Sequence, residues 1–177
     1  SKRASLVKFI SFRIERIIMV NTNEDGHHNH LIAKFLPKLS DAANNRGVVC
    51  GHVRVDKSYI PKQVARGIEM SYVFPKRKSL PARIEMWIYH RKHSGGIEAS
   101  KELFEHFLSK KDEIEESYGG PLNWNYEGRK TAYSIQQDYP EFQLSKESEW
   151  DEWIDRIVSD MKRLDDSLIP FYINTRN

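Results

Sequence analysis

The sequence predicts an α+β domain, in which an antiparallel sheet of about five strands is covered by long amphipathic helices. Short runs rich in Val, Ile, Tyr and Phe follow one another in pairs separated by turn residues, which favours antiparallel pairing. Longer segments repeat apolar residues every three or four positions, as amphipathic helices do. A length of 177 residues, with 39% hydrophobic and 30% charged side chains, suits a single globular domain.

Residues 1–25 are predicted to form an N-terminal extension whose secondary structure the sequence leaves open. Leu6, Ile10 and Ile14 recur at helical spacing, but the β-branched and aromatic side chains of this segment suit a strand as well. We assign residues 26–177 to the single α+β domain.

An amphipathic helix is predicted over residues 28–46. Its apolar positions lie three or four residues apart, and they include Leu31, Ile32, Phe35, Leu36, Leu39, Ala42 and Ala43. Gly47 follows as a stop signal. Pro37 lacks a backbone N–H, so we expect a kink or a break in this helix near Leu36.

Three antiparallel strands are predicted next, over residues 48–55, 67–74 and 82–90. Pro61, Gly67 and the PKRKSLP segment separate them. The second and third strands form a hairpin whose connection carries three consecutive basic residues, Lys76, Arg77 and Lys78.

The remaining elements are two helices and a hairpin. The first helix is expected over residues 97–118, where Gly119, Gly120 and Pro121 end it. The hairpin follows, with aromatic-bearing strands on both sides of a turn that contains Gly128. The last helix is expected over residues 147–168, with Trp150 on its apolar face.

The composition narrows the classes of function. No apolar run approaches the roughly 20 residues that span a membrane, and no cleavable export signal follows the apolar stretch near Ile18. Cys50 is the only cysteine, which excludes internal disulfides and cysteine zinc clusters and suits a reducing compartment. We therefore expect a cytoplasmic protein without a membrane partner.

The net charge of +3 is unevenly distributed along the chain. Residues 1–92 hold 18 Lys and Arg against 7 Asp and Glu, whereas residues 93–177 hold 10 against 18. This division indicates a basic face for nucleic acid, or oppositely charged surfaces that meet in a homo-oligomer, or two ordinary solvated surfaces.

Several motifs resemble the family of bacterial and archaeal proteins known as domain of unknown function 4268. The matching residues are Arg83, Glu85, Phe104, Lys111, Ile114, Glu115, Gly119, Leu122, Trp124, Trp150 and Trp153. The resemblance is strong in the C-terminal half, while residues 28 onward share only the order of elements and residues 1–25 fall outside it. The sequence departs from the family pattern at Asn125 and Tyr126, where a basic residue is usual. The glycine-rich strand that family members have before residue 82 is kept here only at Gly67.

The resemblance implies a partner of nucleases. Such domains occur beside restriction-type endonuclease domains and also alone, and no activity is established for them. We therefore expect an uncharacterised, non-enzymatic accessory or recognition domain of a prokaryotic restriction- or phage-defence-like system, with a nuclease or another defence protein as partner. This expectation comes from the family's neighbours and not from chemistry.

The EDGHHNH segment, residues 24–30, is the first candidate for chemistry. Its side chains His27, His28 and His30 are weak candidates for metal binding, because neighbouring residues seldom converge on one tetrahedral centre and the helical i, i+4 spacing is absent. The favoured interpretation is a capped helix start, in which Asn23 or Asp25 accepts hydrogen bonds from free amides of the first turn. No metal or other cofactor is predicted.

The basic hairpin is the best functional candidate. Its expected phosphate contacts, together with nearby basic side chains, are Arg54, Lys57, Lys62, Lys76, Arg77, Lys78 and Arg83. Arg83 lies two residues from Glu85 on the same strand face, and an ion pair with that carboxylate is its favoured role. The alternative function is therefore a sequence-independent nucleic-acid-binding module that uses the basic half of the chain.

Catalysis is the more distant hypothesis. A metal-dependent nuclease would use acids such as Asp56, Glu69 and Glu85, but no Glu-x-Lys or Asp-x-Lys follows on a strand. Cys50 and His52 lie two residues apart, with no recognisable third member of a catalytic triad. No catalytic residue is predicted.

Overall fold

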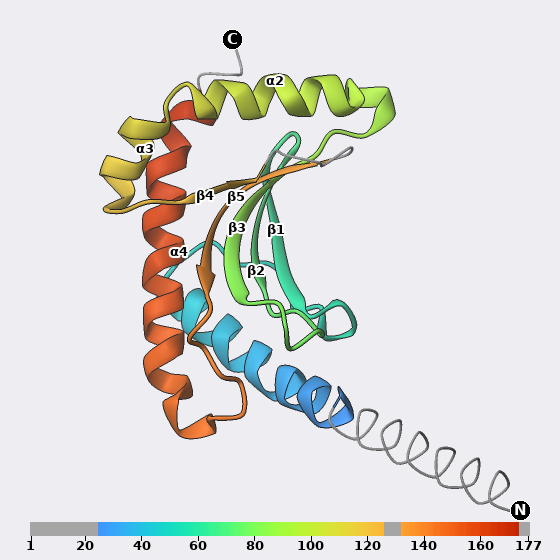
Figure 1. Cartoon of the computed structure of the whole chain (residues 1–177), viewed down its shortest axis with the longest axis vertical. Helices are drawn as coiled ribbons and strands as arrows, with labels where there is room; N and C mark the ends of the chain where they lie inside the picture. Colours follow the sequence, from blue (N-terminus) through green and yellow to red (C-terminus); the bar gives the residue numbers. More distant parts are fainter. Residues whose placement is uncertain (1–24, 126–131, 174–177) are drawn as a thin grey trace, which may run out of the picture.

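The computed structural model describes residues 25–125 and 132–173 of the chain. Their elements are a first helix over residues 25–45, three strands, two helices, two strands and a last helix. The five strands form one antiparallel sheet in the order β1-β2-β3-β5-β4 (Figure 1). The predicted α+β class, with its antiparallel sheet and helices, is confirmed.

The registers of the strands give the sheet one apolar and one polar face. The strands are β1 Tyr59–Ala65, β2 Ile68–Val73, β3 Ala82–Ile88, β4 Asn123–Asn125 and β5 Tyr133–Tyr139. Successive side chains of a strand point to opposite faces. Met70, Met86 and Ile135 are aligned on the apolar face, where the helices pack, whereas Ser71 and Glu85 are aligned on the polar face.

The first strand lies later in the chain than predicted. Residues 48–53 form no strand, and β1 contains Pro61, which we expected to separate two strands. A proline is tolerated here because β1 is an edge strand, which pairs on one side only. Residues 48–53 run beside β1 instead, where Tyr72 Oη donates a hydrogen bond to Val49 O at 3.0 Å.

The first helix is continuous over residues 25–45, so the predicted break near Leu36 is wrong. Pro37 is exposed, which allows water to reach the carbonyl that loses its partner. Phe35 and Leu36 are buried at the same time. The ring of Phe35 lies 4.9 Å from that of Phe74 and 5.1 Å from that of Trp150, which fixes the helix between the sheet and the last helix.

The helix predicted over residues 97–118 is two helices, α2 Gly96–Leu108 and α3 Lys111–Tyr118. At the break, Ser109 Oγ donates to His106 O at 2.6 Å, and Lys110 leaves the helical conformation with φ −109° and ψ 15°. The chain changes direction there, so that α2 crosses one end of the sheet and α3 packs on the last helix (Figure 1). Periodicity did not reveal the break, because apolar residues spaced by seven positions suit an unbroken helix.

The last helix, α4 Trp150–Ile173, follows the short 3-10 turn η3 Glu147–Glu149 and extends beyond the predicted end at residue 168. It runs along the length of the sheet, while the first helix and α2 lie towards the two ends (Figure 1). Trp150 Nε1 donates to Leu144 O at 3.0 Å, and Arg46, directly after the first helix, forms an ion pair with Asp155.

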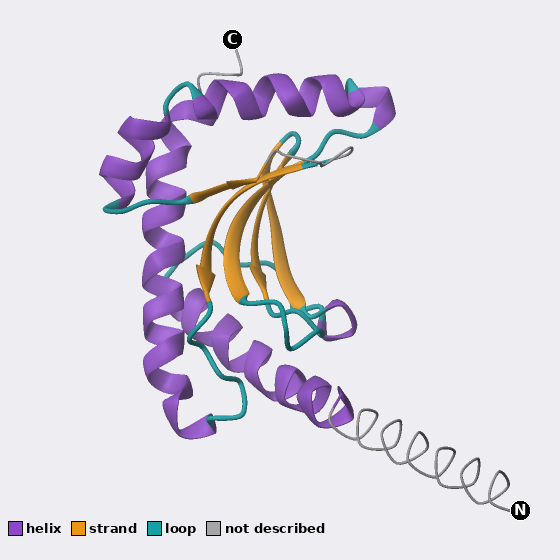
Figure 2. Ribbon diagram, viewed as in Figure 1, coloured by secondary structure: helices purple, strands orange, loops and turns teal. Residues whose placement is uncertain are grey.

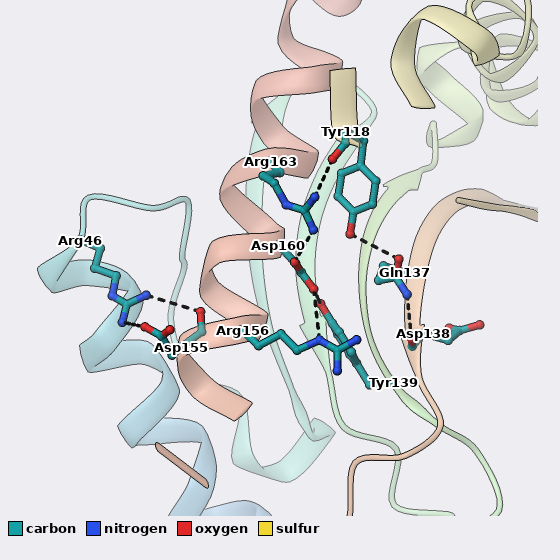
Figure 3. A network of polar contacts seen from close by, with 9 residues as sticks. All are labelled: Arg46, Tyr118, Gln137, Asp138, Tyr139, Asp155, Arg156, Asp160 and Arg163. Atoms are coloured by element: carbon teal, nitrogen blue, oxygen red, sulfur yellow. Dashed lines mark hydrogen bonds and ion pairs between the residues drawn. The ribbon is translucent and has the colours of Figure 1, made fainter. Parts of the chain in front are cut away.

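A buried carboxylate joins α4 to the sheet and to α3 (Figure 3). Asp160 accepts hydrogen bonds from Tyr139 Oη at 2.9 Å and from Arg163 Nη2 at 2.6 Å. Arg163 also donates from Nη1 to Tyr118 O at 2.8 Å, and its guanidinium lies 4.7 Å from the Tyr118 ring centroid. The carboxylate of Asp160 is shielded from water and has its partners, while the guanidinium of Arg163, which is 49% exposed, remains in contact with solvent.

The apolar face of the sheet and the described helices share one hydrophobic cluster. Its largest completely buried side chains include Phe35, Phe104, Phe107 and Tyr72. None of the helices in the described part of the chain combines the length and the apolar character needed to cross a membrane.

Candidate nucleic-acid interface

Five basic side chains from two separate segments gather at one end of the sheet, which we call the basic end. They are Arg54 and Lys57, at the 3-10 turn η1 Val55–Lys57, and Lys76, Arg77 and Lys78, in the loop between β2 and β3. The segments are neighbours because Tyr59 pairs with Val73 and because Phe74 N donates to Ser58 O at 2.9 Å (Figure 2). All five basic side chains are exposed.

The other two predicted phosphate contacts lie outside the basic end. Lys62 is opposite Met70 in the register, so it extends from the apolar face at the exposed edge of β1. Arg83 lies on the polar face, where its Nε donates to Glu85 Oε2 at 2.7 Å. The Arg83 and Glu85 side chains are 22% and 6% exposed, so the ion pair that we favoured for Arg83 is present and largely shielded.

The EDGHHNH segment is helical from Asp25, the first residue that the structure describes, so Asp25 is not the cap of this helix. The other predicted cap, Asn23, lies outside the described residues. His28 Nε2 lies 3.1 Å from Pro75 O, which joins this helix to the basic loop. Lys34 donates to Glu147 at 2.7 Å and lowers the pKa of that carboxyl, an effect to which the charges of His27 and His30 add.

The three histidines do not converge on one point. His28 contacts a backbone carbonyl, whereas His27 and His30 act on the carboxylate of Glu147. Among residues 25–125 and 132–173, no group of three or more His, Cys, Asp or Glu side chains could hold a metal ion.

A cavity of about 390 Å³ lies beside the basic end. The first helix contributes His27 and His28 to its wall, the basic loop contributes Lys78 and Leu80, and the segment after β5 contributes Phe142. The histidine segment and the basic loop, whose contacting residues His28 and Pro75 are 47 residues apart in sequence, therefore border one surface.

The polar face of the sheet was not anticipated as a site. Its side chains are Tyr59, Pro61, Gln63, Glu69, Ser71, Val73, Arg83, Glu85, Trp87, Asn123, Asn125, Ser134, Gln136 and Asp138. Gln136 and Asn123 donate to the two carboxylate oxygens of Asp138 at 2.7 and 2.6 Å, and Ser134 Oγ donates to Gln136 at 3.0 Å. The signal in the sequence was the alternation of polar and apolar residues over 82–88 and 133–139.

A metal-dependent nuclease needs carboxylates that hold Mg²⁺ and a lysine beside them, and the positions of these side chains can be checked in the structure. Glu69 and Glu85 lie on the same face of adjacent strands, but Asp56 is in the exposed η1 turn. Lys62, the lysine within β1, extends from the opposite face of the sheet. The described residues therefore do not place a lysine of these strands beside the two carboxylates.

Cys50 and His52 have different environments. Cys50 Sγ lies 3.7 Å from Ser40 Oγ, and burial raises the pKa of the thiol, although Ser40 and Lys62 oppose this effect. His52 is exposed. A raised thiol pKa disfavours the thiolate that a cysteine nucleophile requires.

Trp124 packs against the core. Its Nε1 donates to Glu115 Oε1 at 2.9 Å, and its ring meets the Phe104 ring edge-on with centroids 6.1 Å apart. Glu115 Oε1 also accepts a hydrogen bond from Leu122 N at 2.9 Å, so this glutamate ties α3 to the start of β4.

Comparison with known proteins gives one family match. Residues 63–171 match the model described as "Domain of unknown function (DUF4268)". The matched range begins within β1 and ends near the end of α4, and it leaves out the first helix. No curated protein and no solved structure matches the chain.

Proposed function

The chain belongs to the family described as domain of unknown function 4268, and we propose that it is a non-enzymatic recognition domain that binds nucleic acid through its basic end. The observation that carries the proposal is the meeting of Arg54 and Lys57 with Lys76, Arg77 and Lys78 at one end of the sheet. Exposed lysine and arginine side chains contact phosphates, and such contacts supply most sequence-independent affinity.

The structure of the basic end offers little means of recognising the base sequence of a nucleic acid. Its side chains come from a 3-10 turn and a loop, and no helix long enough to enter a major groove presents them. We therefore expect contacts with the nucleic-acid backbone and little sequence preference from this part of the molecule.

We further propose that the domain is an accessory of a nuclease in a prokaryotic restriction- or phage-defence-like system. We also propose that the chain can form a homo-oligomer. The family resemblance supports the first of these proposals. The division of charge along the chain supports contact between unlike surfaces. Light scattering at high protein concentration measures the oligomeric state, and a strict monomer would argue against self-association.

Binding through the basic end is tested by fluorescence anisotropy with labelled DNA and RNA. The triple variant Lys57→Ala, Lys76→Ala, Arg77→Ala should weaken binding by at least about tenfold at low salt, and the dependence of affinity on salt should become shallower. Lys111→Ala, which removes an exposed lysine at the start of α3, is the matched control and should bind as the unchanged protein does.

Two results would contradict the proposal. If neither DNA nor RNA binds at low salt, the basic end has another purpose. If nucleic acid is cleaved in the presence of Mg²⁺ and Glu85→Gln abolishes the cleavage, the domain is an enzyme and its site is the polar face.

A further inference from the structure

A groove of about 600 Å³ runs along β1 and β2 on the polar face, at a distance from the basic loop along the strands. Tyr59, Glu69 and Trp87 contribute to it from three adjacent strands, since their side chains share that face. Tyr89, which is 46% exposed, adds a third aromatic ring just after β3. Three aromatic rings and the carboxylate of Glu69 therefore line the groove.

The carboxylate of Glu69, which lines this groove, is held in place by a hydrogen bond. Ser71 Oγ donates to Glu69 Oε1 at 2.9 Å, which orients the carboxylate within the groove. A fixed carboxylate accepts hydrogen bonds, and it suits a ligand that offers an N–H group to it. The other acids of the polar face already have partners, because Arg83 pairs with Glu85 and Asn123 donates to Asp138.

Positive charge lies at both ends of the groove. Arg66, in the β1–β2 turn, and Arg91, after β3, line the end farthest from the basic end, and both are exposed. At the other end, Tyr59 lies two residues after Lys57, the exposed lysine of the η1 turn. Tyr89 N donates to Gly67 O at 2.9 Å, so the two segments with these arginines are held together.

Aromatic rings that lie between two positively charged ends match a single-stranded nucleic acid. Unpaired nucleobases stack on Trp and Tyr, while the phosphates that flank them contact arginine and lysine. Duplex DNA hides its base faces within the stack, so it cannot use the rings in this way. A carboxylate, moreover, accepts a hydrogen bond from the exocyclic amino group of cytosine.

We propose that this groove binds the unpaired bases of a single-stranded nucleic acid, and that Glu69 favours bases that carry an exocyclic amino group. The bases stack on Tyr59, Trp87 and Tyr89, and Arg66 and Arg91 contact the backbone beyond them. This inference rests on the proposed function, because the basic end supplies contacts to the same strand.

The test compares single-stranded oligonucleotides of dC and dT with a duplex, by anisotropy at one salt concentration. Tyr89→Ala and Trp87→Ala should each weaken binding of single-stranded dC by at least about fivefold, since one stacked base is lost, and should leave duplex binding unchanged. Lys111→Ala is again the control, because Lys111 is exposed on α3 and lies outside both the groove and the basic end. Circular dichroism confirms that each variant is folded.

Base selection is tested with Glu69→Gln. The unchanged protein should bind dC more tightly than dT, and the glutamine, which can donate to thymine O4 as well as accept, should reduce this preference towards equality. A preference that survives in Glu69→Gln overturns the role of Glu69.

The outcomes separate this inference from the proposed function. If dC, dT and duplex bind equally and the aromatic variants change nothing, the groove is not the site, while the basic end remains supported by the triple variant. If the unchanged protein binds no nucleic acid at all, both proposals fail together.

Discussion

Asp160 shows how much one polar residue contributes to the fold. Its carboxylate is almost completely buried, yet it has a tyrosine hydroxyl and an arginine as partners from different elements. Arg163 is 49% exposed, so water solvates it if Asp160 is removed, whereas the Tyr139 hydroxyl, in a residue only 1% exposed, is left without an acceptor.

The variant Asp160→Ala should therefore lower the free energy of unfolding by about 1–3 kcal/mol, as measured by urea denaturation, because the buried Tyr139 hydroxyl loses its acceptor. Asp160→Asn, which keeps an acceptor for Tyr139, should cost less. The matched control is Asp166→Ala, which removes an exposed pair with Lys162 on the same helix and should cost about 0.5 kcal/mol. Equal losses for Asp160→Ala and Asp166→Ala would contradict the role of the buried network.

The same network makes stability sensitive to alkaline pH. Burial, with a further contribution from the charge of Asp160, raises the pKa of Tyr118 to about 12, whereas an unfolded tyrosine titrates near 10. The neutral phenol is thus favoured in the folded state, and its contribution is complete below pH of about 10 and is lost as pH rises towards 12. Burial raises the pKa of Tyr139 as well.

Tyr118→Phe should accordingly show a shallower loss of stability between pH 10 and pH 12 than the unchanged protein, in urea titrations at several pH values. At pH 8, where both states keep the proton, any difference between the two proteins reports only the lost hydroxyl contact with Gln137. Parallel curves above pH 10 would show that Tyr118 ionises as freely in the folded protein as in the unfolded one.

At the scale of the element, β1 depends on the segment that crosses it. Residues 48–53 have the composition of a strand, but they lie beside β1 and not within the sheet. They come close to β1 at Gly51, where an added Cβ atom would lie 1.6 Å from the carbonyl oxygen of Pro61. Only a residue without a side chain fits between these two backbones.

Gly51→Ala should therefore destabilise the protein by about 1–3 kcal/mol, because the backbone of β1 or of the crossing segment must move. Gly120→Ala is the matched control, since a Cβ there meets no heavy atom within 4 Å, and its effect should stay within about 0.5 kcal/mol. Thermal or urea unfolding of the two variants measures the difference. A neutral Gly51→Ala would mean that the crossing segment moves freely.

At the scale of the whole molecule, the first helix lies outside the range matched by the family model but inside the hydrophobic core. It contributes Leu31, Ile32, Phe35, Leu36 and Leu39, none of them more than 2% exposed. Each such side chain contributes about 1.5–3 kcal/mol on burial. Their sum is comparable with the whole stability of a typical domain, about 5–15 kcal/mol.

A fragment of residues 59–173, which keeps the sheet and the later helices, should therefore be unfolded or aggregated when the full chain is folded, as judged by circular dichroism and light scattering. A synthetic peptide of residues 25–46 added to this fragment should restore part of its structure, because it supplies the missing apolar face. If the fragment alone unfolds cooperatively and its free energy of unfolding equals that of the full chain, the sheet does not depend on the first helix for its stability.

The candidate site was only partly predictable from the sequence. The basic side chains were identified by type, but Arg54 and Lys57 become neighbours of Lys76 and Arg77 only because β1 pairs with β2 in one register. The polar face was missed, although the alternation over 82–88 is plain, because alternation shows that a face exists and does not show which strands lie beside it.

The sequence by itself determined the order of helices and strands, the apolar stripes of the helices and the two-sided character of the strands, since these depend on periodicity within each segment. Only the tertiary structure decided that residues 59–65 and not 48–55 form the first strand, and that the helix breaks at Ser109. It also decided which polar side chains share a face. The physical reason is that contacts between residues far apart in the chain decide which segments pair as strands and where each helix has room to continue.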